Sequence, residues 1–324
     1  MNPSVKNCRI CGASTSADIV TFHELMFGTG EEFSYFECAN CGCIQIDEIP
    51  LDLGRYYPAN YYASVSGGGR RKLRDRLLAE RFCAESGGWS LPGYFLRMVF
   101  GADPIARMIR TQNIARDAKI LDVGCGDGRF LDLMHGAGYQ DLAGVDPFLV
   151  KDTSTASGVP LYKKSFEEIH DAYDLIMFHH SLEHMPDPVN VFEHLSVTLR
   201  RGGVALIRVP LCDSEAYRLY GVNWIQADPP RHLYLFTKKS MELLAARYGF
   251  VVERVVYDST ALQLWGSEQA RRGIPLCDKN SYFVNKNSAK FTRSEIKSYA
   301  LRANDWNMRG IGDQAAFFLR HAGE

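Results

Sequence analysis

A glycine-rich turn at residues 124–128 carries the strongest chemical signal in the sequence. It follows an apolar run from Lys119 to Val123 that predicts a buried strand, and a helix is expected to begin near Arg129. Glycines in such a turn allow positive φ angles and let a ligand approach the backbone where a Cβ would collide. A strand, a glycine turn and a helix in this order form the usual nucleotide cradle of doubly wound α/β folds.

An acidic residue favours the same interpretation over an ordinary tight turn. Asp146 lies 20 residues after Gly126 and ends a second apolar strand, which begins at Leu142. A carboxylate in this position can accept hydrogen bonds from both hydroxyls of an adenosine ribose. The sequence therefore predicts an adenosine-containing ligand at this turn.

Two cysteine pairs near the N-terminus have the spacing of a metal site. Cys8 and Cys11 form one Cys-x-x-Cys-Gly motif, and Cys38 and Cys41 form another. Each motif places two thiolates on one edge of a tetrahedron, so the two together complete a four-cysteine zinc site. This predicts a structural Zn²⁺ in a small zinc ribbon. Redox-active dithiols are the main alternative, and Cys43 is a spare thiol that could replace Cys41.

Composition limits the classes of protein. The 324 residues, 46% of them apolar, suffice for one large core and a small accessory module. A net charge of −1 supplies no overall field to recruit nucleic acid or an anionic membrane, so no nucleic-acid partner is expected. The sequence shows no signal peptide or membrane-spanning run, and five of its nine cysteines crowd into residues 8–43. We expect a cytoplasmic protein.

Strands and helices alternate after Asp146. Strands are expected over 173–178 and 204–209, with a helix over 189–199 between them. This alternation predicts a doubly wound, mostly parallel sheet whose ligands bind at the carboxyl ends of the strands. His179 lies at one of these ends. Arg208, inside an apolar strand, is expected to pair with a buried acid such as Asp122 or Asp174, or to meet an anionic substrate group.

Four segments together resemble class I S-adenosylmethionine-dependent methyltransferases over about residues 115–255. They are Leu-Asp-Val-Gly-Cys-Gly-Asp-Gly (121–128), Gly-Val-Asp-Pro (144–147), Ser-Leu-Glu-His-Met-Pro-Asp-Pro (181–188) and Arg-Gly-Gly (201–203). The resemblance implies a Rossmann-like fold with S-adenosylmethionine as the cofactor. In it, Gly124 and Gly126 line the methionine moiety, Asp146 holds the ribose, and Ser165 and Phe166 flank the adenine. The full set of implied cofactor-binding residues is Asp122, Gly124, Cys125, Gly126, Asp146, Pro147, Ser165, Phe166 and His179.

A zinc ribbon ahead of such a core resembles the sugar C-methyltransferases and related enzymes of bacterial glycan pathways. Those enzymes carry a Glu-His-x-x-Tyr-Phe-Ser segment whose histidine is a base. Here His232 and Phe236 match, Arg231 replaces the acid and Leu235 replaces the tyrosine. The resemblance implies a sugar, nucleotide-sugar or glycan acceptor. The missing acid weighs against a carbon acceptor and in favour of a hydroxyl.

Histidines near the carboxyl ends of the strands are the candidate catalytic residues. His232 is the first candidate base, and His180 and His184 are next, with Glu183 between them. The pattern His-x-x-Glu-His also occurs in inverted zinc peptidases, but here it lies in a strand-to-helix turn, so we reject that interpretation. A divalent ion held by His180, Glu183 and His184 stays open, as does a metal-assisted, quinone-type O-methyltransferase. A nucleic-acid-binding zinc ribbon on a vestigial core is the non-enzymatic alternative.

Four segments are expected along the chain. Residues 1–62 form the ribbon with a tyrosine-rich end, and 63–115 form a helical linker or lid whose basic part, 70–82, leaves contact with a membrane surface open. Residues 116–258 form the cofactor-binding core, in which 211–236 is a long irregular insertion that shapes the substrate pocket. Residues 259–324 form an excursion and an antiparallel closing strand, and the excursion either completes the acceptor site or builds a dimer contact.

Overall fold

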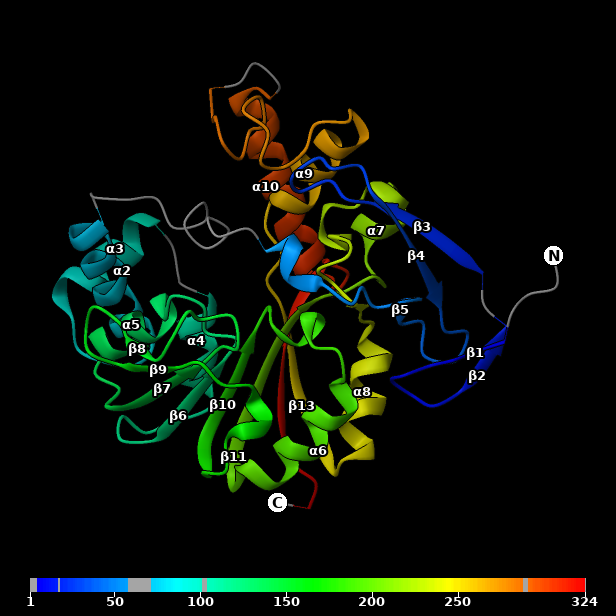
Figure 1. Cartoon of the computed structure of the whole chain (residues 1–324). Coiled ribbons are helices and arrows are strands. Elements are labelled where there is room, and N and C mark those ends of the chain that lie inside the picture. The colour runs from blue at the N-terminus through cyan, green and yellow to red at the C-terminus, as the bar shows by residue number, and fades with distance from the viewer. Residues whose placement is uncertain (1–4, 17, 58–70, 101–103, 288–290, 324) are drawn as a thin grey trace.

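An eight-stranded sheet lies at the centre of the computed structural model, which describes residues 5–16, 18–57, 71–100, 104–287 and 291–323 (Figure 1). The strand order is β13-β14-β11-β10-β6-β7-β9-β8. The strands are β6 (Lys119–Val123), β7 (Asp141–Val145), β8 (Thr153–Ser154), β9 (Pro160–Tyr162), β10 (Tyr173–His179), β11 (Leu199–Pro210), β13 (Phe250–Tyr257) and β14 (Gln314–His321).

The pairing of these strands is mostly parallel. β11, β10, β6, β7 and β9 pair in parallel. β14 is antiparallel and lies between β11 and β13. This arrangement confirms the Rossmann-like, doubly wound fold and the inserted antiparallel closing strand that the sequence predicts.

Helices cover both faces of the sheet. On one face, Phe82, Met108 and Met134 pack from α2 (Arg71–Glu85), α4 (Pro104–Thr111) and α5 (Arg129–Gly136). On the other face, Phe192 and Leu244 pack from α6 (Pro188–Thr198) and α8 (Lys238–Arg247). Burial of alternate strand residues on both faces leaves the carboxyl ends of the strands as the polar edge at which a ligand can bind.

The N-terminal region forms two small sheets. β1 (Val5–Asn7) pairs with β2 (Ser14–Ser16), and a second sheet has the order β12-β5-β4-β3. Its strands are β3 (Ile19–His23), β4 (Glu32–Glu37), β5 (Ile44–Ile46) and β12 (Tyr234–Leu235). Because β12 comes from the core, the ribbon's sheet is completed by a strand from a distant part of the chain. The ribbon side chains Phe22 and Tyr35 also join the hydrophobic cluster of the α6 and α8 face.

The connection over residues 211–236 is more regular than the sequence suggests. It contains helix α7 (Glu215–Tyr220) and the short 3₁₀ turns η4 (Gly221–Asn223) and η5 (Ile225–Ala227) before β12. The prediction of an irregular insertion is therefore wrong, because the connection is a series of short helices and turns. Apolar periodicity over so few residues is too brief to read as a helix, although Ser214 caps α7 by accepting a hydrogen bond from Tyr217 N.

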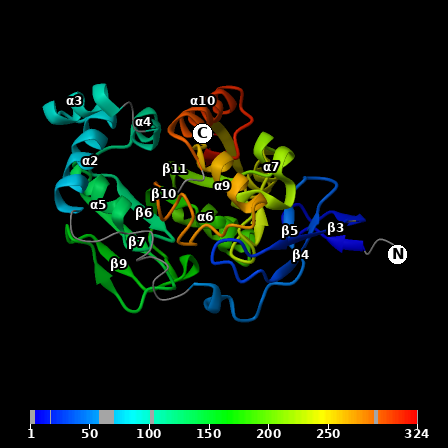
Figure 2. The ribbon, with the colours of Figure 1, turned by 90° about the horizontal axis from the view of Figure 1, so that it is seen from above.

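The C-terminal excursion lies beyond the carboxyl ends of the parallel strands. It contains α9 (Leu262–Arg271) and α10 (Arg293–Met308), drawn in orange to red at the top of Figure 1. Seen from above, the ribbon and helices α2 and α3 (Leu91–Phe100) lie on opposite sides of the molecule (Figure 2). Among the described residues, no helix combines the length and the apolar character needed to cross a bilayer. Most of the tyrosine-rich segment, residues 58–62, lies outside the described residues.

Candidate functional site

The glycine turn has the backbone that its sequence predicts. Gly124, Gly126 and Gly128 have φ angles of 75°, 53° and 70°. A Cβ on Gly124 would lie 2.4 Å from the Ser181 Cβ, so the turn also packs too closely against the end of β10 for any larger residue. The turn is held to the neighbouring strand by a hydrogen bond from Gly124 N to the Val145 carbonyl, 2.8 Å long.

Asp146 lies directly beside this turn, as its spacing predicts. Its Oδ2 accepts a hydrogen bond from Gly126 N at 3.0 Å and its Oδ1 accepts one from Phe148 N at 2.8 Å. The buried carboxylate therefore fixes the glycine turn and the loop after β7 relative to each other. A carboxylate oxygen can accept more than one hydrogen bond, so these contacts are compatible with a bound ligand. The neighbouring Pro147 is exposed.

Two buried polar groups beside the turn lack partners among the described residues. They are Oδ1 of Asp122, at the end of β6, and Nε2 of His179, at the end of β10. Burial, with a smaller contribution from Asp146, raises the pKa of Asp122 to about 8. Burial also holds the pKa of His179 well below its ordinary value. Unpaired buried groups at the carboxyl ends of parallel strands leave hydrogen-bonding capacity for a polar ligand.

Ser165 and Phe166 occupy a 3₁₀ turn, η2 (Phe166–Glu168), after β9. Ser165 begins this turn through a reciprocal capping pair with Glu168. The Phe166 ring is buried against Phe178 and His194, at centroid distances of 5.3 and 4.9 Å. Because the ring is part of the core, Phe166 can offer a ligand its backbone but not its side chain.

A group of acid and histidine side chains lies at the end of β10. His180 has a φ of 52°, and η3 (Leu182–His184) follows it. His180 Nδ1 lies 3.1 Å from Oε1 of Glu183, whose side chain is fully buried. Oε2 of Glu183 has no partner among the described residues.

His232 meets this acid from the loop before β12. Its Nδ1 lies 2.7 Å from the Gln226 carbonyl, which can only accept, so Nδ1 carries the proton. The other nitrogen, Nε2, lies 4.0 Å from Glu183 Oε1. His184 lies beside it, with ring centroids 4.8 Å apart. The potential ligand atoms of Glu183, His184 and His232 all lie within 4.8 Å of one another, so His232, and not His180, completes the most compact triple.

The histidines around Glu183 favour the ionised form of its carboxylate. Burial alone would raise the pKa of Glu183, but the His180 hydrogen bond and the neighbouring His184 and His232 lower it to about 2. Burial lowers the pKa of His184. His184 Nδ1 lies 2.8 Å from the Arg231 carbonyl and 3.0 Å from the Tyr57 hydroxyl. Tyr57 thereby brings the end of the N-terminal region to the same group.

Arg231 explains the position at which the sequence departs from the sugar-methyltransferase segment. Its buried guanidinium pairs with Asp228 and donates a hydrogen bond to Glu24 Oε1 at 2.7 Å. Glu24 in turn accepts backbone N–H bonds from Met26, Phe27, Gly28 and Thr29 in the loop between β3 and β4. Arg231 therefore ties the ribbon to the loop that carries His232. The acid beside His232 is Glu183, which a motif search at position 231 misses.

Arg208 pairs with Asp258, at 2.6 Å, at the end of β13. The expected partners Asp122 and Asp174 are wrong, since Asp122 keeps an unpaired oxygen and Asp174 pairs with Arg200 at 2.7 Å. Strand β14, which comes from the end of the chain, lies between β11 and β13 in the sheet. The Arg208–Asp258 pair therefore spans β14, and no local pattern in the sequence indicates it.

A cavity of about 370 Å³ opens beside the histidines. It is lined by residues of the His180 turn, the loop before β12, the C-terminal excursion, the closing strand and the ribbon: Met26, His180, His184, Ile225, Gln226, Asp228, His232, Thr260, Leu262, Gln263, Leu276, Phe283, Asp313 and Gln314. The sequence predicts a substrate pocket shaped by the histidines and by residues 211–236, with the excursion as one way to complete it, and residues of all three line this cavity. The residues from the excursion have no recognisable motif.

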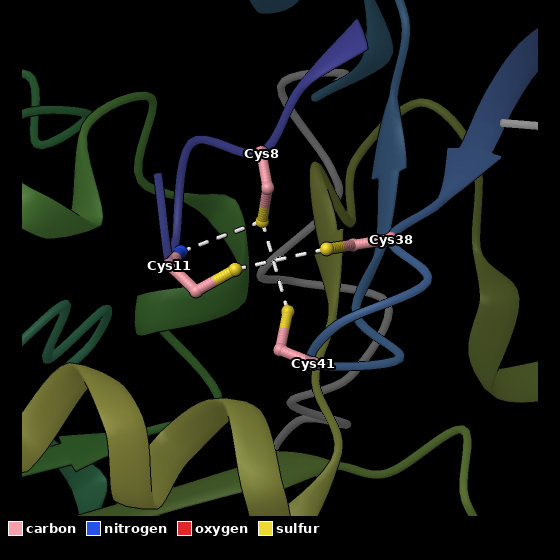
Figure 3. A group of neighbouring side chains, drawn as sticks. All are labelled: Cys8, Cys11, Cys38 and Cys41. Atoms are coloured by element: carbon pink, nitrogen blue, oxygen red, sulfur yellow. Dashed lines mark hydrogen bonds between the residues drawn. The ribbon is translucent and has the colours of Figure 1, made fainter. Parts of the chain in front are cut away.

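The four N-terminal cysteines converge as their spacing predicts (Figure 3). Their Sγ atoms all lie within 4.8 Å of one another, with Cys8–Cys41 and Cys11–Cys38 distances of 3.7 Å. Cys43 lies outside this cluster and is buried, so the suggested exchange with Cys41 is not seen. Gln45 donates a hydrogen bond from Nε2 to Cys8 Sγ at 2.9 Å, a contact the sequence did not indicate.

Comparison with known proteins agrees with the fold. The family model described as "Methyltransferase domain" matches residues 96–255. The middle of the chain is therefore a methyltransferase domain, and its fold is that of the class I S-adenosylmethionine-dependent enzymes.

Curated relatives match less than half of the chain. A tRNA U34 carboxymethyltransferase of Colwellia psychrerythraea is 29% identical over 155 residues, which cover 44% of this chain and 48% of that protein. A ubiquinone biosynthesis O-methyltransferase of Chromobacterium violaceum is 31% identical over 139 residues, covering 39% of this chain and 60% of that protein. The chain thus matches about half of each relative's length.

Solved structures overlap more of the chain at lower identity. A SAM-dependent methyltransferase from Archaeoglobus fulgidus has a TM-score of 0.40 and 18% identity, covering 70% of this chain and 97% of that one. An O-methyltransferase from a polyketide multienzyme of Brevibacillus brevis, in complex with S-adenosyl-L-homocysteine, has a TM-score of 0.39 and 16% identity, covering 73% and 81%.

Proposed function

We propose that the chain is an S-adenosylmethionine-dependent methyltransferase that acts on a sugar or glycan, at a hydroxyl or a carbon. The observation that carries the proposal is the polar edge formed by β6, β7 and β10. There, the glycine turn, the unpaired Asp122 oxygen and the Glu183–His232 pair occur within one methyltransferase domain.

The donor set fits the cofactor. Asp122 would face the ammonium group of the methionine moiety, because an unpaired buried carboxyl oxygen gains most from a cation. Gly124, Cys125 and Gly126 would line that moiety, Asp146 and Pro147 the ribose, and Ser165 with the Phe166 backbone the adenine. His179 would lie beside the cofactor. When bound, S-adenosylmethionine supplies an electrophilic methyl group whose leaving group is a neutral thioether.

The protein's own contribution is alignment of the acceptor and removal of its proton. Good alignment supplies about 7–11 kcal/mol of barrier lowering in such displacements. His232 is the base: its Nδ1 proton is held by the Gln226 carbonyl, which leaves Nε2 to take the acceptor's proton. The ionised Glu183 carboxylate, 4.0 Å away, stabilises the imidazolium that results. His180 and His184 hold and surround that carboxylate as positioning residues.

The four-cysteine cluster supports a structural role for Zn²⁺. Two Cys-x-x-Cys turns with all four sulfurs within 4.8 Å supply a closed tetrahedral set with no position for a substrate. The Gln45 hydrogen bond to Cys8 is the kind of outer contact that orients a metal-bound thiolate. Zinc would thereby hold the ribbon in the place where it contacts the His232 loop.

Calorimetric titration with S-adenosylmethionine tests the proposal. We expect one site per chain, with Asp146→Ala lowering the affinity. We then expect labelled methyl groups to appear on nucleotide-linked or lipid-linked sugars, identified by mass spectrometry. Absence of cofactor binding by the folded protein would refute the enzyme assignment.

A metal-assisted O-methyltransferase of the quinone type is the second candidate, favoured by the Glu183, His184 and His232 triple. Two imidazoles and one carboxylate with open positions suit a transition metal better than Mg²⁺. Mn²⁺ added to the zinc-loaded protein would then bind at a site separate from the zinc site, and Glu183→Gln would abolish this binding. The enzyme would also methylate a catechol. Full activity on a sugar in the presence of chelator, with zinc retained, would remove this candidate.

A further inference from the structure

Two glutamines in helix α9 are buried to the same extent but differ in their contacts. Gln263 and Gln269 are each 1% exposed. The Gln269 amide is satisfied: Nε2 donates to Ser281 Oγ at 2.9 Å and Oε1 accepts from Tyr282 N at 2.7 Å. Neither Nε2 nor Oε1 of Gln263 has a partner among the described residues. A buried amide with both atoms unpaired is costly, so its retention needs a reason.

Gln263 lines the cavity that also contains His232. The other polar groups of the excursion and closing strand that line the cavity are already engaged. Asp313 accepts a hydrogen bond from Trp224 Nε1 at 2.9 Å, and Gln314 Nε2 donates to Asp258 Oδ1 at 2.9 Å. Among the polar residues of the excursion and closing strand that line the cavity, Gln263 is the one whose side chain has no hydrogen-bond partner among the described residues.

The charge of the cavity limits what that molecule can be. Its described lining contains two acids, Asp228 and Asp313, and three histidines, but no lysine or arginine. A phosphate or carboxylate inside it would have no fixed cation to pair with. The group that enters is therefore not an anion, and any phosphate of the acceptor lies outside the cavity.

We propose that Gln263 is a specificity-determining residue that binds the neutral, hydroxyl-bearing head group of the acceptor. This inference rests on the proposed function and adds to it. A carboxamide offers one donor and one acceptor side by side, and sugar hydroxyls, which both donate and accept, match it. The apolar side chains of Leu276 and Phe283, which also line the cavity, would cover the ring carbons. A sugar unit held in this way shares the cavity with His232.

The first test compares the two glutamines without any acceptor. Gln269→Leu breaks two hydrogen bonds and leaves Ser281 Oγ and Tyr282 N without these partners. The Tm of this variant should therefore fall by roughly 2–6 °C. Gln263→Leu removes only unpaired atoms, so its Tm should be unchanged or higher, and Gln263→Met should behave alike. A fall in the Tm of Gln263→Leu as large as that of Gln269→Leu would show that the amide is bonded within the protein and would overturn the inference.

The second test measures methyl transfer from labelled S-adenosylmethionine to a UDP- or dTDP-linked hexose, to uridine and to a catechol. We expect transfer to a hexose, and a KM for it that rises by about 10- to 100-fold in Gln263→Leu while the cofactor Kd stays unchanged. An unchanged KM for the hexose would overturn the inference. Transfer to uridine or the catechol instead of any hexose, or absence of cofactor binding by the wild-type protein, would instead refute the proposed function, so the two failures are distinguishable.

Discussion

Two compact groups of potential metal ligands occur among the described residues, and they are assembled in different ways. The cysteine cluster takes its four members from two turns of the ribbon, at Cys8–Cys11 and Cys38–Cys41. The Glu183, His184 and His232 group joins the turn after β10 to the loop before β12. The first is closed by its own local geometry, whereas the second depends on Arg231, Asp228 and the ribbon loop around Glu24 to hold His232 in place. Local spacing thus builds the structural group, and tertiary packing builds the candidate catalytic one.

The variant expected to have the largest effect disrupts the cysteine cluster. Cys38→Ser removes one sulfur of four, so zinc content should fall from one to near zero per chain and the ribbon should unfold, because such sites contribute on the order of 10 kcal/mol. Elemental analysis and circular dichroism measure this. The matched control is Cys43→Ser, which alters a buried thiol outside the cluster and should keep its zinc. Zinc loss in both variants, or in neither, would contradict the assignment of the four ligands.

The variant expected to have the next largest effect removes the packing that supports the Glu183, His184 and His232 group. Arg231→Met leaves the carboxylates of Glu24 and Asp228 buried without their cation, which should cost about 3–5 kcal/mol of unfolding free energy in urea titrations. The exposed Arg55–Glu31 pair in the same region is the control, and Arg55→Met should change stability little. Equal losses in the two variants would mean that Arg231 is not the tie between ribbon and core.

Within the second group, His232 is expected to act on rate. His232→Ala should lower kcat by about 10²- to 10⁴-fold with no change in cofactor affinity, because it removes the base but no cofactor contact. Glu183→Gln should also lower kcat, but by less, because the imidazolium formed during transfer loses its stabilising charge. His23→Ala, at an exposed site in the ribbon, serves as the control. A wild-type rate in His232→Ala would eliminate this residue as the base.

A smaller effect concerns the pH dependence of cofactor binding. Burial raises the pKa of Asp122 to about 8, so below that pH most of the free protein carries the neutral acid. Pairing with the cofactor ammonium requires the carboxylate, so affinity should rise by up to about tenfold per pH unit from about pH 6 to 8 and then level off. Asp122→Asn should bind more weakly and show a flat profile over this range. Calorimetry at several pH values measures both, and a steep profile retained in Asp122→Asn would contradict the role of Asp122.

The sequence predicted those features that depend on neighbouring residues. The glycine turn, the position of Asp146 at the end of the next strand and the two cysteine turns follow from spacing, and the mostly parallel sheet follows from alternating strands and helices. Contacts between distant segments were missed. The partner of Arg208 is Asp258 and the acid beside His232 is Glu183, and both pairs are created by strand order and loop packing. The burial of the Phe166 ring and of the Gln263 amide likewise depends on surrounding elements that no local pattern encodes.

Calorimetric titration of the zinc-loaded chain with S-adenosylmethionine tests the central claim most directly. We predict saturable binding at one site per chain, weakened by Asp146→Ala and unaffected by His232→Ala. A folded, zinc-loaded protein that gives no binding, or whose binding is indifferent to Asp146, would contradict the claim that the glycine turn at residues 124–128 holds a methyl donor.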